Sequence, residues 1–346
     1  MQLKYFKELD GVRGLAALMV VVFHINQATG NNSFIERLIH KPGTIGQTGV
    51  ILFFVLSGFL ITRILIASKE RPHYFSNFYI RRSFRIFPLY YLSLLIFLVV
   101  VPLISTGQVT NFKDSWTFWV YLQNVAMTFN WPLNGPGHFW SLAVEEHFYL
   151  IWPLVVYYCN DRSLLKVIIG IIITSIFFRI LFAHLGYGTF YFTFTTMDCL
   201  AMGGFAALNY NHKWLSVKKA LLIISVLLIT LAASWYFLGK TKSDVVSLFK
   251  VPLTAFFYML LILILTEKET FLNRIFNLNF LRYTGKISYG LYIFHPLCIE
   301  IAVKYFYTTS FLPTLILIFL ASYGIAIASF YLYESRFLRL KDKFSS

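Results

Sequence analysis

Residues 9–24 read LDGVRGLAALMVVVFH, an apolar run that also carries Asp10, Arg13 and His24. At about 100° per residue, the eleven steps from Arg13 to His24 return a helix to within about 20° of its starting direction. These two side chains therefore share one helical face with Asp10 and are about 16 Å apart along the axis. An ionisable group at membrane depth costs roughly 3 kcal/mol or more unless it faces a cavity or a partner, so this stripe is a candidate functional site. The alternative is a polar stripe that only holds helices together.

The composition is that of a membrane protein. Of the 346 residues, 58% are hydrophobic and 13% are charged, which is outside the range of soluble domains. We expect an all-α, polytopic membrane protein of about ten transmembrane helices. It should form a single transmembrane domain over residues 1–346 with no separate soluble domain. The expected segments are 10–28, 46–67, 86–104, 141–160, 165–184, 192–209, 218–238, 246–266, 287–307 and 312–333.

The net charge of +15 is distributed as a topology signal and does not indicate a nucleic-acid partner. With the N-terminus inside, twenty Lys and Arg residues fall in the inner segments and five fall in the outer loops. This asymmetry orients both termini toward the cytoplasm and favours contact with anionic membrane lipid. We therefore expect a multi-pass protein of the inner (plasma) membrane.

Neither a metal site nor a cleaved leader is expected. Cys159, Cys199 and Cys298 stand singly in apolar segments, without the spacing of metal ligands or of a disulfide framework. The first apolar run carries charge and has no small-residue cleavage site, so it is not typical of a signal peptide.

Two connections stand out between the expected spans. Residues 68–85 form a basic cytoplasmic connection, and residues 105–140 form the longest outer loop. Within that loop, the aromatic stretch 116–129 predicts a short re-entrant or interfacial helix, because it is too short to span comfortably.

Arg82 and Arg85 lie at the cytoplasmic start of the third expected span. They are one helical turn apart and could present two guanidinium groups together. Guanidinium groups match the geometry of phosphate oxygens, so the pair suits a nucleotide or another polyphosphate. The alternative is an anchor to the inner leaflet.

An acidic pair opens the fourth span from the outer side, in the run WSLAVEEHF of residues 140–148. Adjacent carboxylates inside an apolar helix are costly, and a neighbouring histidine, His147, favours proton transfer. Glu145 shares a face with Trp152, whereas Glu146 points about 100° away. A carboxylate could meet His24 if the first and fourth spans pack together. The alternative is an acidic pair solvated by the outer loop.

Two further spans carry polar residues. Asp198 is a lone acid within the span 192–209, and Arg179 on the preceding span is a plausible partner. Ser288, Tyr292 and His295 share one face of the span 287–307, where His295 could be either structural or catalytic.

Small residues and a terminal acid complete the survey. The glycines between residues 46 and 58 permit close helix approach. Glu334 ends the last span beside Arg336, which favours an ion pair at the membrane edge.

Taken together, these motifs closely resemble the acyltransferase-3 family of integral-membrane acyltransferases, which acylate cell-surface polysaccharides and related glycans. The matching features occur in the family's order over nearly the whole chain. They are Arg13 followed by His24, Arg82 with Arg85, the run from Trp140 to Glu146, and Ser288-Tyr289 through His295-Pro296.

The resemblance implies a ten-helix core that takes acyl-CoA, most simply acetyl-CoA, from the cytoplasm. The acyl group would pass to a surface polysaccharide or a lipid-linked glycan on the far side. By the same resemblance, His24 is the catalytic histidine with Arg13 on its helix, and Arg82 and Arg85 contact the CoA phosphates. We add Glu145 and Asp10 to the catalytic set, Glu145 to orient or deprotonate the acceptor and Asp10 to bias the charge of His24. The expected substrate-binding residues are Glu146, His147, Ser288, Tyr292 and His295.

The chain departs from the family pattern at three places. His147 stands where the family usually has Gln, and Ser335-Arg336 replaces the usual Arg-Pro after Glu334. Thr196 stands where an Arg usually precedes the Asp by two, which puts that ion pair in doubt. No esterase-like soluble domain follows in this chain, so we expect transfer to finish within the membrane domain or with a partner.

Two other functions fit parts of this pattern. A secondary transporter or flippase of a glycan or glycolipid would explain intramembrane charges and ten spans, but no inverted repeat is detectable. A non-catalytic scaffold would need neither His24 nor the inner arginines. Release of CoA from a thioester donor distinguishes the enzyme from both.

Overall fold

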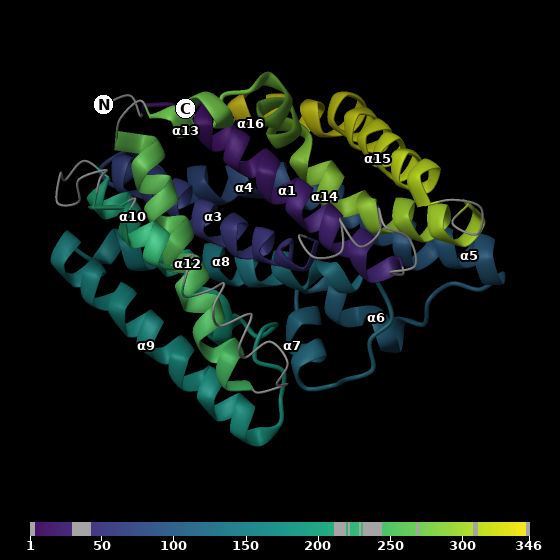
Figure 1. Cartoon of the computed structure of the whole chain (residues 1–346), viewed down its shortest axis with the longest axis horizontal. Helices are drawn as coiled ribbons and strands as arrows, with labels where there is room; N and C mark the ends of the chain where they lie inside the picture. The colour runs from purple at the N-terminus through teal and green to yellow at the C-terminus, as the bar shows by residue number, and fades with distance from the viewer. Residues whose placement is uncertain are drawn as a thin grey trace. The chain divides into compact units, whose positions relative to one another are not determined.

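The computed structural model describes residues 4–29, 43–210, 219–220, 222–227, 230, 244–267, 270–306 and 311–343. Over these ranges the regular structure is helical, as predicted, and contains no strand (Figure 1). The elements are α1 (Glu8–Ala28), α3 (Thr48–Ser68), α4 (Tyr74–Leu95), η1 (Ile96–Val100), α5 (Val101–Thr106), α6 (Phe112–Trp119), α7 (Gln123–Thr128), η2 (Gly137–Phe139), α8 (Trp140–Tyr158), α9 (Asp161–Leu185), α10 (Thr193–Asn209), α12 (Asp244–Glu267), α13 (Phe271–Phe276), α14 (Asn279–Phe306), α15 (Phe311–Ala328), η3 (Ser329–Glu334) and α16 (Ser335–Lys343).

Nine of the ten expected spans coincide with helices in the described part of the chain. The tenth, 218–238, lies largely outside the described residues. Among the described residues, five helical stretches are long and apolar enough to cross a membrane, namely Gly43–Ser68, Tyr74–Thr106, Asp161–Leu185, Leu248–Thr266 and Phe311–Leu340. The chain is therefore a helical membrane protein, and the larger count of about ten spans stays a prediction.

Two connections differ from their predicted form. The basic connection at 68–85 is shorter than expected, because α4 already begins at Tyr74 and includes Arg82 and Arg85. The stretch 116–129 is divided between α6 and α7 and does not form one helix. Tyr121 between them has φ of 58°, and a left-handed residue interrupts a right-handed helix.

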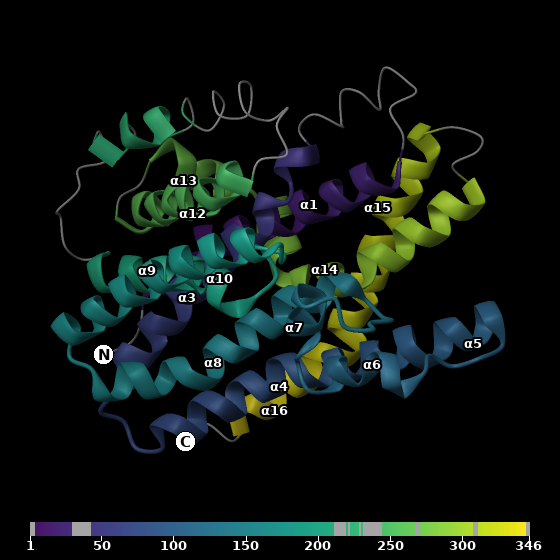
Figure 2. The same ribbon diagram turned by 90° about the horizontal axis from the view of Figure 1, so that it is seen from below.

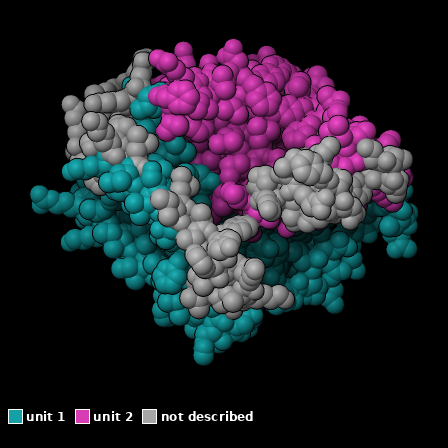
Figure 3. Space-filling model, viewed as in Figure 1, with its two compact units in different colours: residues 1–4, 54–78, 94–270 teal, residues 5–53, 79–93, 271–346 magenta. Residues whose placement is uncertain are grey.

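The chain divides into two compact units that are interleaved in sequence, and each is described separately (Figure 3). Unit 1 comprises residues 1–4, 54–78 and 94–270. Unit 2 comprises residues 5–53, 79–93 and 271–346.

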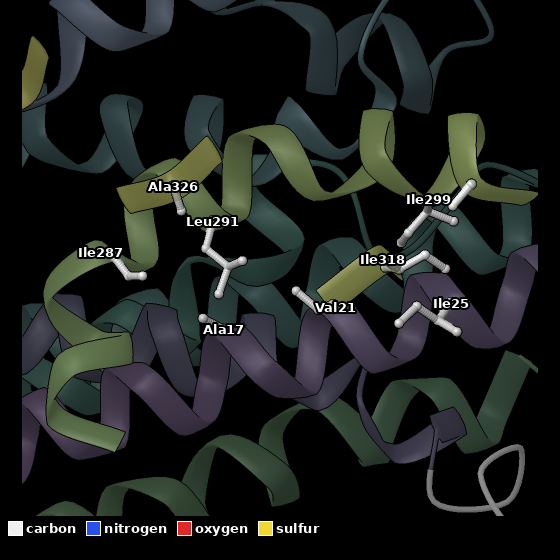
Figure 4. Packing of buried hydrophobic residues seen from close by; sticks show 9 residues of the cluster. Ala17, Val21, Ile25, Ile287, Leu291, Ile299, Ile318 and Ala326 are labelled. Atoms are coloured by element: carbon white, nitrogen blue, oxygen red, sulfur yellow. The ribbon is translucent and has the colours of Figure 1, made fainter. Parts of the chain in front are cut away.

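Unit 2 is built around α1 and α14, with α15 packed against α14. Its core is a cluster of buried aliphatic side chains from these three helices (Figure 4). Because lipid is as apolar as these side chains, close packing rather than expulsion of water holds such helices together. The cluster consists of Ala17, Val21, Ile25, Ile287, Leu291, Ile299, Ala302, Ile318 and Ala326.

Glycines bring α1 and α14 unusually close. A Cβ on Gly14 would collide with the backbone oxygen of Leu281 and would lie 3.0 Å from the backbone nitrogen of Gly285. A Cβ on Gly285 would in turn collide with the backbone of Asp10. Only glycine fits at this crossing, which fixes the position of the Arg13 and His24 face relative to α14.

Unit 1 contains α8, α9, α10 and α12, with α9 beside α10 (Figure 2). Helix α9 begins at an Asn160 cap, whose side chain accepts a hydrogen bond from the Ser163 backbone N–H at 2.9 Å. It ends at Gly186, whose φ of 75° favours glycine. The predicted close approach at Gly58 is confirmed, because a Cβ there would collide with the backbone of Leu200 on α10.

Candidate active site

A cationic cavity of about 650 Å³ lies in unit 2 where α1 and α14 begin. Four of its lining side chains are cations, which come from three helices: Arg13, Arg85, Arg282 and Lys286. Asp10 and Glu334 supply the carboxylates of the lining. A polar cavity of this size and charge suits an anionic ligand with several phosphate oxygens.

The N-terminal turns of α1 hold Asp10 and Arg13 in place. Arg13 Nη1 lies 3.5 Å from Asp10 Oδ1 within the same helix, and the Tyr5 hydroxyl donates to the other Asp10 oxygen. Burial, together with this hydrogen bond, raises the pKa of Tyr5 above its ordinary value. Tyr5 therefore remains a donor to Asp10 at neutral pH, and Asp10 and Arg13 stay together at the cavity wall.

Helix α4 is tied to the rest of unit 2 close to Arg85. The Tyr289 hydroxyl donates to the Ile86 carbonyl at 2.9 Å, and the Tyr333 hydroxyl donates to the Pro88 carbonyl at 3.3 Å. A carbonyl oxygen has two lone pairs, so each of these can accept a side-chain donor in addition to a backbone N–H. These bonds hold Arg85 at the cavity, whereas Arg82 is not among its lining residues.

Arg282 and Lys286 are held by α14, one turn apart. The Lys286 ammonium lies 4.9 Å from the centre of the Phe330 ring, a cation–π distance. Arg282 Nε is buried and has no hydrogen-bond partner among the described residues. A buried guanidinium donor without an acceptor is costly, and an anion in the cavity would satisfy it.

His24 lies at a second, more open cavity of about 500 Å³, close to the other end of α1. It lies on the same helix as Arg13, and the helical rise over the residues between them corresponds to about 16 Å along the axis. The lining combines apolar and polar side chains, namely His24, Gln27, Ala28, Pro296, Ile299, Glu300, Val303 and Lys304.

The structure brings His24 into direct contact with His295. Nδ1 of His24 lies 2.9 Å from Nε2 of His295 and 3.0 Å from the Val20 carbonyl oxygen. Nδ1 of His295 lies 3.1 Å from the Leu291 carbonyl oxygen. His295 is fully buried, and the centre of the Tyr292 ring lies 5.9 Å from that of His295. The two imidazoles therefore form a hydrogen-bonded pair between α1 and α14.

The predicted face of α14 runs from one cavity toward the other. Ser288 lines the cationic cavity and donates to the Gly285 carbonyl at 2.9 Å, and His295 contacts His24. In the part of unit 2 that the structure describes, no residue lines both cavities. Ala17, Val21 and Leu291 of the aliphatic cluster lie at intermediate positions along the two helices (Figure 4).

The acidic run of α8 lies in unit 1. Ser57 on α3 donates to Glu145 Oε1 at 2.7 Å, and Trp152 Nε1 donates to Thr62 of the same helix at 2.8 Å. This agrees with the shared face that the sequence predicts for Glu145 and Trp152. Glu146 is partly buried on the adjacent position.

His147 belongs to a polar network in unit 1. Its Nδ1 lies 2.7 Å from the Thr193 hydroxyl, which accepts a hydrogen bond from Asn124 Nδ2 at 2.9 Å. His147 therefore links α8 to the start of α10 and to α7.

Comparison with known proteins identifies the family. A profile described as an acyltransferase domain, that of acyltransferase-3, matches residues 6–333. The chain belongs to the acyltransferase-3 family. Membership of a family of acyltransferases supports the enzyme over the transporter or scaffold that the sequence pattern left open.

Relatives of this acyltransferase include O-acetyltransferases. The peptidoglycan O-acetyltransferase OatA of Listeria monocytogenes is 27% identical over 325 residues, which cover 84% of this chain and 49% of OatA. YrhL of Bacillus subtilis, provisionally assigned the same activity, is 28% identical over 323 residues, covering 84% of this chain and 48% of YrhL. The chain thus spans about half the length of these two relatives.

A third relative is matched over most of its length. A provisionally assigned acetyltransferase of the Acidianus two-tailed virus is 28% identical over 314 residues, covering 87% of this chain and 86% of the viral protein. No solved structure matches the chain.

The doubtful ion pair of the family pattern is present in this acyltransferase in another form. Arg179 of α9 binds Asp198 of α10 with 2.5 Å between Nη2 and Oδ1, and both side chains are almost fully buried. Residues two apart on a helix do not face each other, so an Arg at position 196 would not lie beside Asp198. The threonine at this position therefore does not weaken the contact between Arg179 and Asp198. The plausible partner that the sequence indicates is the one observed.

Sequence reasoning missed several residues of the two cavities. From the sequence alone, Arg282 and Lys286 were included only in the number of basic residues on the inner side. Their spacing of four residues places both side chains on one helix face, as the spacing of three does for Arg82 and Arg85. Glu334, which the sequence placed in a membrane-edge ion pair with Arg336, lines the cationic cavity and accepts a hydrogen bond from Ser329 at 2.8 Å. Gln27, Glu300 and Lys304 at the second cavity carry no distinctive local pattern.

Proposed function

We propose that this acyltransferase moves an acetyl group from cytoplasmic acetyl-CoA to a hydroxyl of a cell-surface glycan or lipid-linked glycan precursor. The observation that supports this best is the pair of cavities at opposite ends of α1 and α14 in unit 2. One is cationic, and the other contains a hydrogen-bonded histidine. Separate sites for an anionic donor and for the chemistry are what a reaction across a membrane requires.

The cationic cavity is our donor site. Arg13, Arg85, Arg282 and Lys286 would contact the phosphates of CoA, and the buried Arg282 Nε would gain an acceptor. Arg82, one turn from Arg85, would act from outside the lining as a longer-range charge. In this proposal both termini and the donor cavity face the cytoplasm, in agreement with the distribution of basic residues.

His24 is our catalytic residue. It would either remove the proton of the acceptor hydroxyl or carry the acetyl group as a nucleophile. Binding of the CoA phosphates far from the thioester allows remote binding energy to position the reacting carbon. The aliphatic cluster around Ala17 and Val21 fills the α1–α14 seam between the two cavities, so passage of the pantetheine arm would require this seam to open.

The acceptor would enter the cavity beside His24, where Gln27, Glu300 and Lys304 can bind hydroxyl groups. Glu145 and Glu146 are assigned to the acceptor side by the family resemblance. Ser57 orients Glu145, and His147 positions α8 through Thr193. The peptidoglycan acetylation named for OatA supports a glycan acceptor for this chain.

The test is acetyl transfer by the purified full chain in lipid vesicles that contain lipid-linked glycans from the expression host. With radiolabelled acetyl-CoA, we expect release of CoA and label in the glycan fraction. His24→Ala should abolish both, and His184→Gln, an exposed histidine in the last turn of α9, should change neither. Transfer by His24→Ala at the wild-type rate would refute the catalytic role, and glycan movement without CoA release would refute acetyl transfer.

A further inference from the structure

The hydrogen bonds around His24 determine which ring nitrogen carries its proton. A backbone carbonyl can only accept, so Nδ1 of His295, 3.1 Å from the Leu291 oxygen, is the protonated nitrogen of that ring. The other nitrogen of a neutral His295, Nε2, then accepts. The proton between the two rings consequently resides on Nδ1 of His24, 2.9 Å away.

A second contact leads to the same assignment. Nδ1 of His24 also lies 3.0 Å from the Val20 carbonyl oxygen, which again requires a proton on that nitrogen. If His295 were doubly protonated and donated from Nε2, the lone pair of His24 Nδ1 would face the Val20 oxygen. That arrangement is repulsive, so the neutral pair with His24 as donor is favoured.

We propose that His295 is a positioning residue that orients His24 and keeps its basic lone pair on Nε2. This inference depends on the proposed function of His24. It gives the buried His295 the part that a carboxylate plays in many catalytic histidine sites, but without introducing a second charge into the apolar seam. His295 touches neither donor nor acceptor in this proposal.

The proton transfers follow from this arrangement. Nε2 of His24 takes the proton of the acceptor hydroxyl while that oxygen bonds to the thioester carbon. The ring becomes an imidazolium, and its Nδ1–H bond to His295 becomes charge-assisted. When the carbon–sulfur bond breaks, the same proton passes from Nε2 to the departing CoA sulfur, so His24 returns to its neutral form.

The charged and titratable groups that the described residues place beside this pair come from α14. Glu300 and Lys304 of α14 line the same cavity as His24, and Tyr292 of α14 lies against His295. Glu300 and Lys304 are one helical turn apart, so they can offset each other's charge. The contact to His295 is therefore the interaction most directly coupled to the charge of His24.

Three substitutions at position 295 test whether His24 needs a hydrogen-bond acceptor there or only a side chain that fills the space. Gln reaches the position of Nε2 and can accept from His24, Asn reaches only the position of Nδ1, and Leu offers no acceptor. We expect His295→Gln to keep at least about a third of wild-type kcat. His295→Asn and His295→Leu should lose about 10- to 100-fold in kcat with little change in the KM for acetyl-CoA.

The pH profile adds a readout that a purely structural role would not move. In the Asn and Leu variants, the midpoint of the acid limb of kcat should fall by about one pH unit, because the imidazolium has lost its acceptor. Cys298→Ala, which removes a buried side chain from the same helix, should leave this midpoint unchanged.

The outcomes distinguish this inference from the proposed function. An inactive wild type, or a fully active His24→Ala, contradicts the proposed function itself. If wild type is active and His24→Ala is not, equal activity of the Gln and Asn variants overturns the role of His295. The comparison of these two amides decides the matter even if His295→Leu does not fold.

Discussion

Substitution of Gly14 by Ala tests whether the α1–α14 crossing sets the geometry of the histidine pair. An added Cβ would meet the Leu281 carbonyl oxygen head-on and would lie 3.0 Å from the Gly285 nitrogen. Both obstacles are backbone atoms, so no side-chain rotation relieves the clash. The helices must separate locally by about 1 Å to restore ordinary contact distances.

The expected magnitude combines two opposing effects. Overpacking of this kind costs about 1–3 kcal/mol, and Ala recovers up to about 1 kcal/mol through its better helix propensity. The net loss of about 1–2 kcal/mol should lower the midpoint of thermal unfolding by roughly 2–6 °C. The same separation would lengthen the 2.9 Å contact between His24 and His295 beyond about 3.5 Å, where a hydrogen bond no longer counts. We therefore expect acetyl transfer to fall more than about 10-fold.

The assay is thermal unfolding of the detergent-solubilised protein alongside CoA release in vesicles. Gly170→Ala in α9 and Gly324→Ala in α15 are matched controls, because a Cβ at either position meets no atom within 4 Å. Both controls should be neutral or slightly stabilising. A Gly14→Ala protein with wild-type midpoint and activity would refute the reasoning, as would an equal loss in the two controls.

Three further predictions concern charge and polar contacts. In steady-state assays, the KM for acetyl-CoA should rise about 5- to 10-fold, with kcat nearly unchanged, in each of the variants Arg85→Gln, Arg282→Gln and Lys286→Gln. The variant Arg82→Gln should raise this KM less. If all four variants had the KM of wild type, the cationic cavity would not be the donor site. Arg179→Met should cost about 3–5 kcal/mol by leaving Asp198 as a buried charge, and the double variant with Asp198→Leu should recover most of this in unfolding measurements. Ser57→Ala should lower the transfer rate severalfold without changing CoA binding, since it removes the 2.7 Å bond that orients Glu145; an unchanged rate would separate Glu145 from the reaction.

Much of the local structure was predictable because helical periodicity is encoded in neighbouring residues. The common face of Arg13 and His24, the one-turn spacing of Arg82 and Arg85, and nine of the apolar segments follow from residue spacing and composition alone. The family is likewise carried by short motifs whose order along the chain is visible without a structure.

Only the tertiary structure decided which of these faces meet. His24 and His295 are 271 positions apart, and their contact depends on a crossing at Gly14 and Gly285 that allows two backbones to touch. The cationic cavity takes Arg85 from one helix and Arg282 from another, and it leaves Arg82 outside its lining. The spacing of residues along one helix determines on which side of that helix each side chain lies. The partner, depth and distance across a helix pair depend on how close the backbones come, and that is set by packing between residues remote in sequence.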